Sequence, residues 1–298
     1  MLDGAARLKE LVTLAEQFQM PALGVTDHGN MFGAYEFYKA AKGSAVRPII
    51  GLEAYLTPKT HRSERKRVQF GDGTGDDVSS KGAYTHMTMW ASNSTGMHNL
   101  FRLSSLSSLE GFFYKPRADR ELLNRYAEGM IATTGCPSGE VQTYLRLGQY
   151  DQAVASAAEF RDIFGAQNFY VELMDHGLEI ENRVRKDLVR LARQLDLPLV
   201  ATNDLHYCKA SDAEAHDVLL CVSSGSNKDT PNRFRFDGNG YYLKSPEQMR
   251  HLFAELPEAC DNTLAIAERC TTTFDEGVGT FMPRFDVPAG ESEASWFI

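Results

Sequence analysis

The stretch GVTDHGNMFG, residues 24–33, sets the pattern from which the fold can be predicted. A short apolar run at residues 22–26 ends abruptly at Asp27 and His28, and a Gly-Asn pair then breaks it. Residues 32–43 follow with the apolar spacing of a helix. A short apolar strand that ends in polar residues and leads into a helix is the repeating unit of α/β proteins.

The same alternation of strand and helix recurs along the whole chain. We expect strands at residues 22–26, 47–56, 83–91, 129–135, 168–174, 197–203 and 241–245. We expect helices at residues 5–18, 32–43, 94–108, 138–146, 150–164, 178–196, 211–222, 246–254 and 257–268. This order predicts a largely parallel sheet covered on both faces, either as a barrel or as a doubly wound sheet. No GxGxxG motif or P-loop follows a strand, so a nucleotide-binding Rossmann fold gains no support.

The composition is that of a globular protein. The 298 residues, 43% apolar and 24% charged, suffice for one large α/β domain or two smaller ones. The net charge of −9 argues against a general nucleic-acid-binding surface, so contact with polyanions would be local or metal-mediated. Five cysteines without a CxxC pair indicate a reducing compartment. Because no apolar run reaches the roughly 20 residues of a membrane span and the N-terminus lacks signal-peptide character, we expect a cytoplasmic protein with no membrane partner.

Histidine, carboxylate and cysteine residues gather at the ends of the expected strands. They are His28, Glu53, His86, Cys136, Asp204 and His206. In parallel barrels, the edge where strands end is the place where active sites are built. A mixture of imidazole, carboxylate and thiolate ligands suits zinc, manganese or iron better than magnesium or calcium. The pattern therefore predicts a metal site of the kind that hydrolyses phosphate esters.

Each of these residues also has an ordinary structural interpretation. Asp27 and His28 could be turn residues with a helix cap, and Glu53 could belong to a salt bridge. His86 alone resembles a core histidine with satisfied hydrogen bonds, and Cys136 alone resembles a small buried apolar residue. The joint pattern favours a metal site, because all these explanations would have to coincide at one sheet edge.

Other candidate residues give weaker signals. Asp204 and His206 lie two residues apart, on one face of an extended segment, although a turn fits equally well. His176 follows a strand and could support the site from behind it. We expect the remaining histidines at the surface: His61, His98, His216 and His251. Residues 58–82 are polar and predict an excursion without a core of its own. Its basic run, residues 59–67, is either a solvated loop or a contact for a phosphate backbone or a partner.

Several segments together resemble the PHP (polymerase and histidinol phosphatase) domain. They are TDHGNMFG, RPIIGLEAY, YTHMTMWA, TTGCPSGEVQ, VELMDHG, ATNDLHY and RFDGNGYYLKS. More narrowly, they resemble the N-terminal region of bacterial replicative DNA polymerase III α subunits in their actinobacterial form, and TTGCPSGE and YYLKS are specific to this branch. The resemblance runs from residue 1 to about residue 296. It implies a distorted (β/α)7 TIM-like barrel.

The resemblance also implies which residues bind metal. By matching the family's motifs, the ligands are Asp3, His28, Glu53, His86, Cys136, Asp204 and His206. Among them, the resemblance assigns catalysis to His28, Glu53, Asp204 and His206, while Asp27 becomes an orienting neighbour. Family members hold up to three divalent metals, here zinc, manganese or iron, and remove nucleotides 3′→5′ in proofreading. The family begins with a strand carrying an HxH pair that is absent here, so we expect a barrel without its first strand and with weakened metal binding and low stability.

The resemblance leads to a functional expectation with two alternatives. We expect a PHP domain at residues 1–275, and a linker with the start of the polymerase palm region at residues 276–298. The chain would be part of a DNA-directed DNA polymerase but could not polymerise alone. Implied partners are the primer 3′ end, the rest of the α subunit, the sliding clamp and a separate proofreading subunit. The alternatives are a non-catalytic module for structure and partner binding, and a phosphatase for small phosphate esters.

Overall fold

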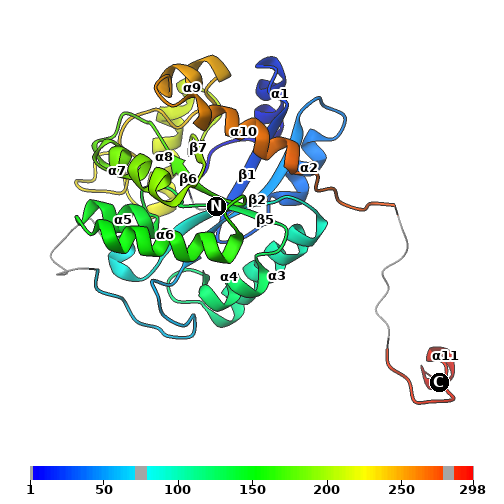
Figure 1. The fold of residues 1–298 in the computed structure, drawn as a ribbon. Helices are drawn as coiled ribbons and strands as arrows, with labels where there is room; N and C mark the ends of the chain where they lie inside the picture. Colours follow the sequence, from blue (N-terminus) through cyan, green and yellow to red (C-terminus); the bar gives the residue numbers. More distant parts are fainter. Residues whose placement is uncertain (1–2, 71–78, 278–284, 298) are drawn as a thin grey trace.

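The computed structural model describes residues 3–70, 79–277 and 285–297. Its centre is a curled sheet with helices packed around the outside (Figure 1). The strands are β1 (Ala22–His28), β2 (Arg47–Leu56), β3 (Thr85–Ala91), β4 (Arg117–Ala118), β5 (Met130–Thr133), β6 (Phe169–Leu173) and β7 (Leu199–Ala201). They lie in the order β1-β2-β3-β5-β6-β7, and the short β4 pairs with β2. The expected α/β fold with a curled, barrel-like sheet is therefore confirmed.

The sheet is largely parallel, as predicted, but one strand, β3, runs against its neighbours. β3 pairs antiparallel with both β2 and β5, whereas the other pairings are parallel. A parallel connection usually needs a crossover helix. The polar excursion between β2 and β3 supplies no α-helix among its described residues, and the chain returns in the opposite direction. This reversal brings the first residues of β3, including His86, to the edge where β1 ends.

The described part of the sheet has two open edges. β1 pairs only with β2, and β7 pairs only with β6 among the described residues. All residues of β1 retain some exposure, whereas β5, β6 and β7 are buried throughout. The barrel is thus open between β1 and β7 in the described part of the chain.

The helices follow the predicted periodicity closely. They are α1 (Leu8–Gln17), α2 (Ala34–Ala41), α3 (Ser94–Glu110), α4 (Arg120–Tyr126), α5 (Glu140–Arg146), α6 (Tyr150–Phe164), α7 (Glu179–Leu195), α8 (Ala213–Ser224), α9 (Pro246–Leu252), α10 (Pro257–Arg269) and α11 (Glu293–Phe297). None of the described helices combines the length and apolar character needed to cross a membrane. The strand β4 and the helices α4 and α11 were not predicted. The strand predicted at 241–245 is wrong, because this segment makes only the isolated bridge between Tyr207 and Tyr242.

Two clusters of buried apolar side chains pack the helices against the sheet. The larger of the two lies between the sheet and helices α3, α6 and α7, where residues such as Leu100, Phe160 and Leu191 are fully buried. A second cluster packs α1 and α2 against β1 and β2 through residues such as Val12 and Phe37. Burying each such side chain stabilises the fold by about 1.5–3 kcal/mol. The strands that carry the candidate ligands are therefore rigidly supported.

Candidate metal centre

The end of β1 delivers His28 to the rim of the barrel. His28 is paired in register with Glu53 of β2, and its Nδ1 lies 2.9 Å from the Glu53 Oε2. Gly29 then turns the chain with φ of +67°, and a Cβ at this position would lie 2.6 Å from Tyr55 and 2.9 Å from Pro116. Both the backbone conformation and the lack of space require glycine here.

Asp27 caps a helix. Its Oδ2 accepts a hydrogen bond of 2.7 Å from the backbone N–H of Gly33, which precedes α2. A carboxylate at a helix N-terminus satisfies a free N–H group and interacts favourably with the helix dipole. Asp27 thus fixes the path of the turn that follows His28.

Six of the seven predicted ligands form two groups, and the donor atoms of each group lie within 4.8 Å of one another. The first group is Asp3, His28 and His206, and the second is Glu53, His86 and Cys136. The contact between His28 and Glu53 joins the two groups. Residues from six separate segments of the chain therefore converge on one place.

The first group lies where the N-terminal segment crosses the rim. The Asp3 Oδ1 lies 3.3 Å from the His28 Nε2, and its Oδ2 lies 4.0 Å from the His206 Nε2. Two hydrogen bonds hold this segment: Ala5 N–H donates to the His206 carbonyl (2.7 Å), and the His216 Nε2 lies 2.8 Å from the Asp3 carbonyl. The surface position predicted for His216 is wrong, because its ring is buried against this segment.

The second group lies deeper. The Glu53 Oε1 lies 2.5 Å from the His86 Nδ1. The Cys136 Sγ lies 3.5 Å from that same nitrogen and 3.9 Å from the Glu53 Oε1. Burial and the neighbouring Glu53 carboxylate raise the pKa of the Cys136 thiol. Without a cation to stabilise it, the thiolate is therefore disfavoured.

Asp204 lies beside the two groups rather than within them. Its carbonyl lies 2.8 Å from the His206 Nδ1, and its Oδ1 lies 3.8 Å from the same nitrogen. Its φ of +31° is in the left-handed region, where a residue other than glycine is strained by about 1–3 kcal/mol. Burial and the Glu53 carboxylate raise the pKa of Asp204 even though His206 opposes the shift. The fold thus holds a carboxylate here at an energetic cost.

The chemistry of the donor set fits a divalent cation. Burial alone would lower the pKa of His28, but the carboxylates of Glu53 and Asp3 outweigh it and raise this pKa to about 11. The site therefore stabilises positive charge at this ring. The His28 Nδ1 is buried and makes no hydrogen bond of good geometry, although Glu53 lies close to it. Imidazole, carboxylate and thiolate donors in one place are the ligands that zinc, manganese and iron accept.

Sequence reasoning missed one buried acid near this centre. Glu172 of β6 is 2% exposed and is bonded by the hydroxyls of Thr133 and Thr202. Burial raises its pKa to about 7, with contributions from the carboxylates of Glu53 and Asp204. Glu172 sits in an apolar strand, as Glu53 does, so the cost of burying a carboxylate would have identified both.

His176 lies next to the centre, and both of its ring nitrogens have hydrogen-bond partners. Its Nδ1 lies 2.6 Å from the Glu181 Oε1, and its Nε2 lies 3.0 Å from the Asn203 carbonyl. Both ring nitrogens have partners, which leaves neither nitrogen for a metal. His176 therefore fixes the backbone next to Asp204.

A cavity of about 320 Å³ lies between α8 and residues 233–241. Phe236 forms part of its lining, and the Phe236 ring packs 4.6 Å from His206 and 5.0 Å from His216. The lining also includes the charged side chains of Asp217, Arg233, Arg235 and Asp237. The cavity therefore lies on the side of α8, next to the Phe236 ring that packs against His206.

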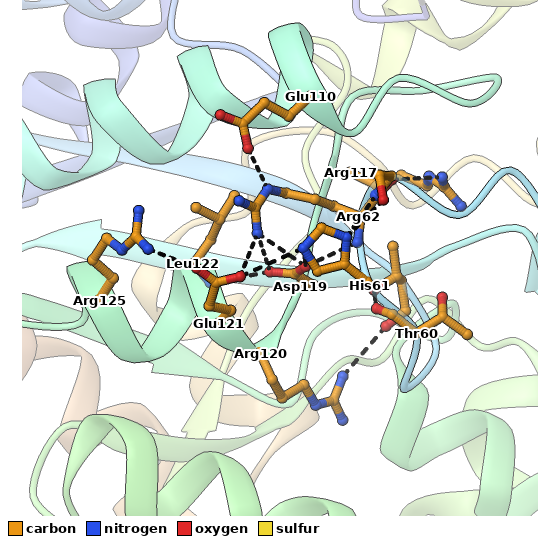
Figure 2. A network of polar contacts seen from close by, with 12 residues as sticks. Thr60, His61, Arg62, Glu110, Arg117, Asp119, Arg120, Glu121, Leu122 and Arg125 are labelled. Atoms are coloured by element: carbon orange, nitrogen blue, oxygen red, sulfur yellow. Dashed lines mark hydrogen bonds and ion pairs between the residues drawn. The ribbon is translucent and has the colours of Figure 1, made fainter.

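The polar excursion between β2 and β3 is anchored in the protein rather than solvated. Arg62 is 7% exposed and lies among the carboxylates of Glu110, Asp119 and Glu121 (Figure 2). Phe70 is also buried. The prediction of an excursion without a core is wrong for these residues, because an arginine and an aromatic ring insert into the fold. Residues 71–78 lie outside the described part.

A further group of potential ligands lies in the same network. His61, Asp119 and Glu121 have donor atoms within 4.8 Å of one another. Arg62 already neutralises both carboxylates, at 3.2 Å from the Asp119 Oδ2 and 3.0 Å from the Glu121 Oε2. A guanidinium in this position takes the place that a metal ion would need.

The sequence is similar to known proteins of one family. Residues 1–176 match the family described as "PHP domain". The chain is 55% identical to the DNA polymerase III subunit alpha of Saccharopolyspora erythraea, over 98% of this chain and 25% of that protein. It is 52% identical to the same subunit of Mycobacterium leprae, over 99% of this chain and 26% of that protein. It is 42% identical to the subunit of Thermus aquaticus, over 99% of this chain and 24% of that protein. The chain thus spans about a quarter of the length of these relatives.

Proposed function

Because the chain belongs to the PHP domain family, we propose that it is the N-terminal PHP domain of a DNA polymerase III α subunit and acts there as a metal-dependent 3′→5′ exonuclease. The observation that carries this proposal is the pair of donor groups joined by His28 and Glu53 at the barrel rim. Two adjacent groups of imidazole, carboxylate and thiolate donors suit phosphodiester hydrolysis, in which two cations can hold the attacking and leaving oxygens.

The proposed ligands divide between the two groups. Asp3, His28 and His206 would hold one divalent cation, and Glu53, His86 and Cys136 would hold another. When bound, such cations lower the pKa of a water molecule and neutralise the charge of a phosphate. We assign Asp204 to the same set, as a carboxylate that completes the coordination from beside His206. The identity of the metal, whether zinc, manganese or iron, belongs to the proposal as well.

Four side chains carry the proposed catalysis. Glu53 contacts both His28 and His86, so its two oxygens fix the separation between the groups. His28 and His206 orient the N-terminal Asp3 carboxylate toward the rim. Asp204 retains 28% exposure of its side chain, which leaves it accessible to a substrate at the rim. These side chains would bind the metal and orient the substrate. Their charges are already in position, so no rearrangement is needed during the reaction.

A primer-degradation assay tests the exonuclease. The 298-residue chain is incubated with a primer that has a mismatched 3′ end, with added zinc, manganese or iron and with EDTA. We expect stepwise 3′ shortening that requires metal and is abolished in the His206→Ala variant. The His251→Ala variant changes an exposed histidine on α9 and should leave digestion unchanged. Absence of any metal-dependent digestion by the wild-type chain refutes the exonuclease.

A non-catalytic structural module is the second candidate. It is favoured by the open sheet edge between β1 and β7 in the described residues and by the position of Asp204 outside both groups. Stoichiometric metal without digestion, together with a large loss of stability on metal removal, would support this candidate. Hydrolysis of a small phosphate ester in preference to DNA would instead indicate a phosphatase.

The remaining assignments follow from the same proposal. Residues 1–275 would form the PHP domain, and residues 276–298 would lead toward the palm region of the polymerase. The five-residue helix α11 buries none of its residues, as expected of a connecting segment. We propose DNA and the rest of the α subunit as partners, with the sliding clamp and a separate proofreading subunit as further ones, and the cytoplasm as the location.

A further inference from the structure

We propose that Lys115, Tyr84 and Arg67 form a subsite on the β2–β3 side of the rim that holds single-stranded DNA leading into the metal centre. The identity of the ligand rests on the proposed function. The location of the subsite rests on the contacts of these three residues, which can be tested without metal and without activity.

Lys115 is a cation placed beside the candidate ligands. Its Nζ lies 5.6 Å from the centre of the Tyr55 ring, and this ring lies 5.1 Å from His86 and 6.4 Å from His28. None of the ion pairs among the described residues involves Lys115, although the whole chain carries a net charge of −9. An ammonium group left without a carboxylate next to a site for phosphodiesters is free to bind a phosphate.

Aromatic rings continue outward from the same point. Tyr84 stacks on His86 at 5.8 Å and packs edge-on against Tyr55 at 4.9 Å. Tyr114, the chain neighbour of Lys115, is 60% exposed, and the Arg67 guanidinium lies 4.9 Å from the centre of its ring. Alternating aromatic rings and cations are the surface on which single-stranded nucleic acids bind, with the bases stacked and the backbone neutralised.

The turn that presents Lys115 is strained. Phe113 and Lys115 form a bridge around Tyr114, whose φ is +63°. This left-handed conformation is costly for a residue other than glycine. Strain of this kind is maintained only where the surrounding structure imposes it.

Arg117 imposes that arrangement. Its guanidinium is completely buried and donates hydrogen bonds to four backbone carbonyls, at distances of 3.0–3.2 Å. The acceptors are the carbonyls of Arg62, Glu64, Ala83 and Gly111. These carbonyls belong to the three segments that carry Arg67, Tyr84 and Lys115.

A second arginine, Arg62, fixes the segment that carries Arg67. Arg62 ties the basic loop to the end of α3 and the start of α4 through Glu110, Asp119 and Glu121 (Figure 2). The three cationic and aromatic side chains are therefore held on a fixed scaffold, so little ordering entropy opposes binding.

The cavity beside α8 offers a competing route for DNA. It contains Arg233 and Arg235 with Phe236. Arg233 is already paired with Asp217 at 2.6 Å, and Asp237 also lines the cavity. Its positive charge is largely balanced, whereas that of Lys115 is not. The charges therefore favour the β2–β3 side.

The test is binding of a fluorescein-labelled oligothymidylate to the 298-residue chain, measured by anisotropy in EDTA over a series of salt concentrations. We expect Lys115→Ala to weaken binding about three- to tenfold and to lower the slope of log K against log salt by about 0.7, the value for one phosphate contact on a single strand. Tyr84→Ala should weaken binding with an unchanged slope, because stacking releases no counterions.

Matched variants separate these effects from misfolding. Lys115→Arg and Tyr84→Phe keep the charge and the ring and should bind as the wild type does. Lys186→Ala removes an equal charge from the exposed side of α7 and should have little effect. Urea unfolding of each variant reports whether it is folded.

Two results would overturn the subsite. One is unchanged affinity and salt slope in folded Lys115→Ala. The other is a loss of binding in Arg235→Ala but not in Lys115→Ala, which would place the DNA beside α8. If the primer assay shows no digestion while Lys115→Ala still lowers the salt slope, the exonuclease fails and the DNA subsite stands.

Discussion

His28 and Glu53 occupy directly paired positions of β1 and β2, and their side chains meet with 2.9 Å between Nδ1 and Oε2. The pairing register of two parallel strands thus brings together residues that are 25 positions apart in the sequence. A register shift of one residue would turn one of them to the opposite face of the sheet. The contact that joins the two donor groups is therefore fixed by the register of β1 and β2.

Replacing Glu53 by glutamine should remove the charge that joins the two groups. The amide keeps the shape but is a poor metal ligand, so we expect at least a tenfold loss of metal affinity and loss of any digestion. Inductively coupled plasma mass spectrometry after gel filtration measures the bound metal. Glu268→Gln, on the exposed face of α10, is the control. Full metal content in Glu53→Gln would show that this carboxylate is not a ligand.

Replacing Gly29 by alanine should destabilise the chain through a steric clash. The new Cβ would meet Tyr55 and Pro116, which we expect to cost about 1–3 kcal/mol beyond the backbone strain. Gly177→Ala isolates that strain, because Gly177 has φ of +76° with no atom within 4 Å of its Cβ position. The free energy of unfolding in urea is measured for both variants. Equal losses would mean that Tyr55 and Pro116 move aside freely.

Replacing Arg117 by lysine should destabilise the chain because one ammonium cannot reach four carbonyls. Leaving buried carbonyls without donors costs about 1–3 kcal/mol each, and partial rearrangement leads us to expect a total of about 2–4 kcal/mol. Chemical denaturation gives this value. Arg125→Lys, at an exposed i, i+4 pair with Glu121, should lose less than about 0.5 kcal/mol. A loss as small as this in Arg117→Lys would show that the buried guanidinium does not hold the three segments.

The contribution of Asp119 to stability should depend on pH. Burial opposes ionisation, but the N–H groups of Leu122 and Arg62 and the Arg62 guanidinium outweigh it and lower the pKa of Asp119 below 3.8. A carboxyl with a lowered pKa in the folded state stabilises it above the unfolded pKa, and this contribution is lost as the pH falls through the folded value. Asp119→Asn should therefore cost about 3 kcal/mol at pH 7.

The difference from the wild type should shrink once the pH falls below about 3.8. Urea unfolding in EDTA between pH 3 and pH 7 measures this difference. Asp162→Asn, whose side chain is 69% exposed, should show no comparable trend. A cost for Asp119→Asn that stays constant down to pH 3 would contradict the lowered pKa.

The periodicity of the sequence predicted most elements, because helices and strands with one apolar face reveal themselves locally. Predicted residues 150–164 and 47–56 coincide with α6 and β2. The direction of β3 was not predictable, since His86 looks the same at the end of a parallel strand and at the start of an antiparallel one. The two-residue strand β4 carries too few residues for any pattern to appear.

The sequence alone determined the α/β class and which donors lie near strand ends, since both depend on local patterns of apolar and polar residues. Only the tertiary structure decided how those donors are grouped. It placed Glu53 between His28 and His86, left Asp204 to one side and buried His216 against the N-terminal segment. It also inserted Arg62 and Arg117 into the protein to hold the polar loops. Grouping and burial depend on register, strand direction and long-range packing, and these join residues that no local pattern connects.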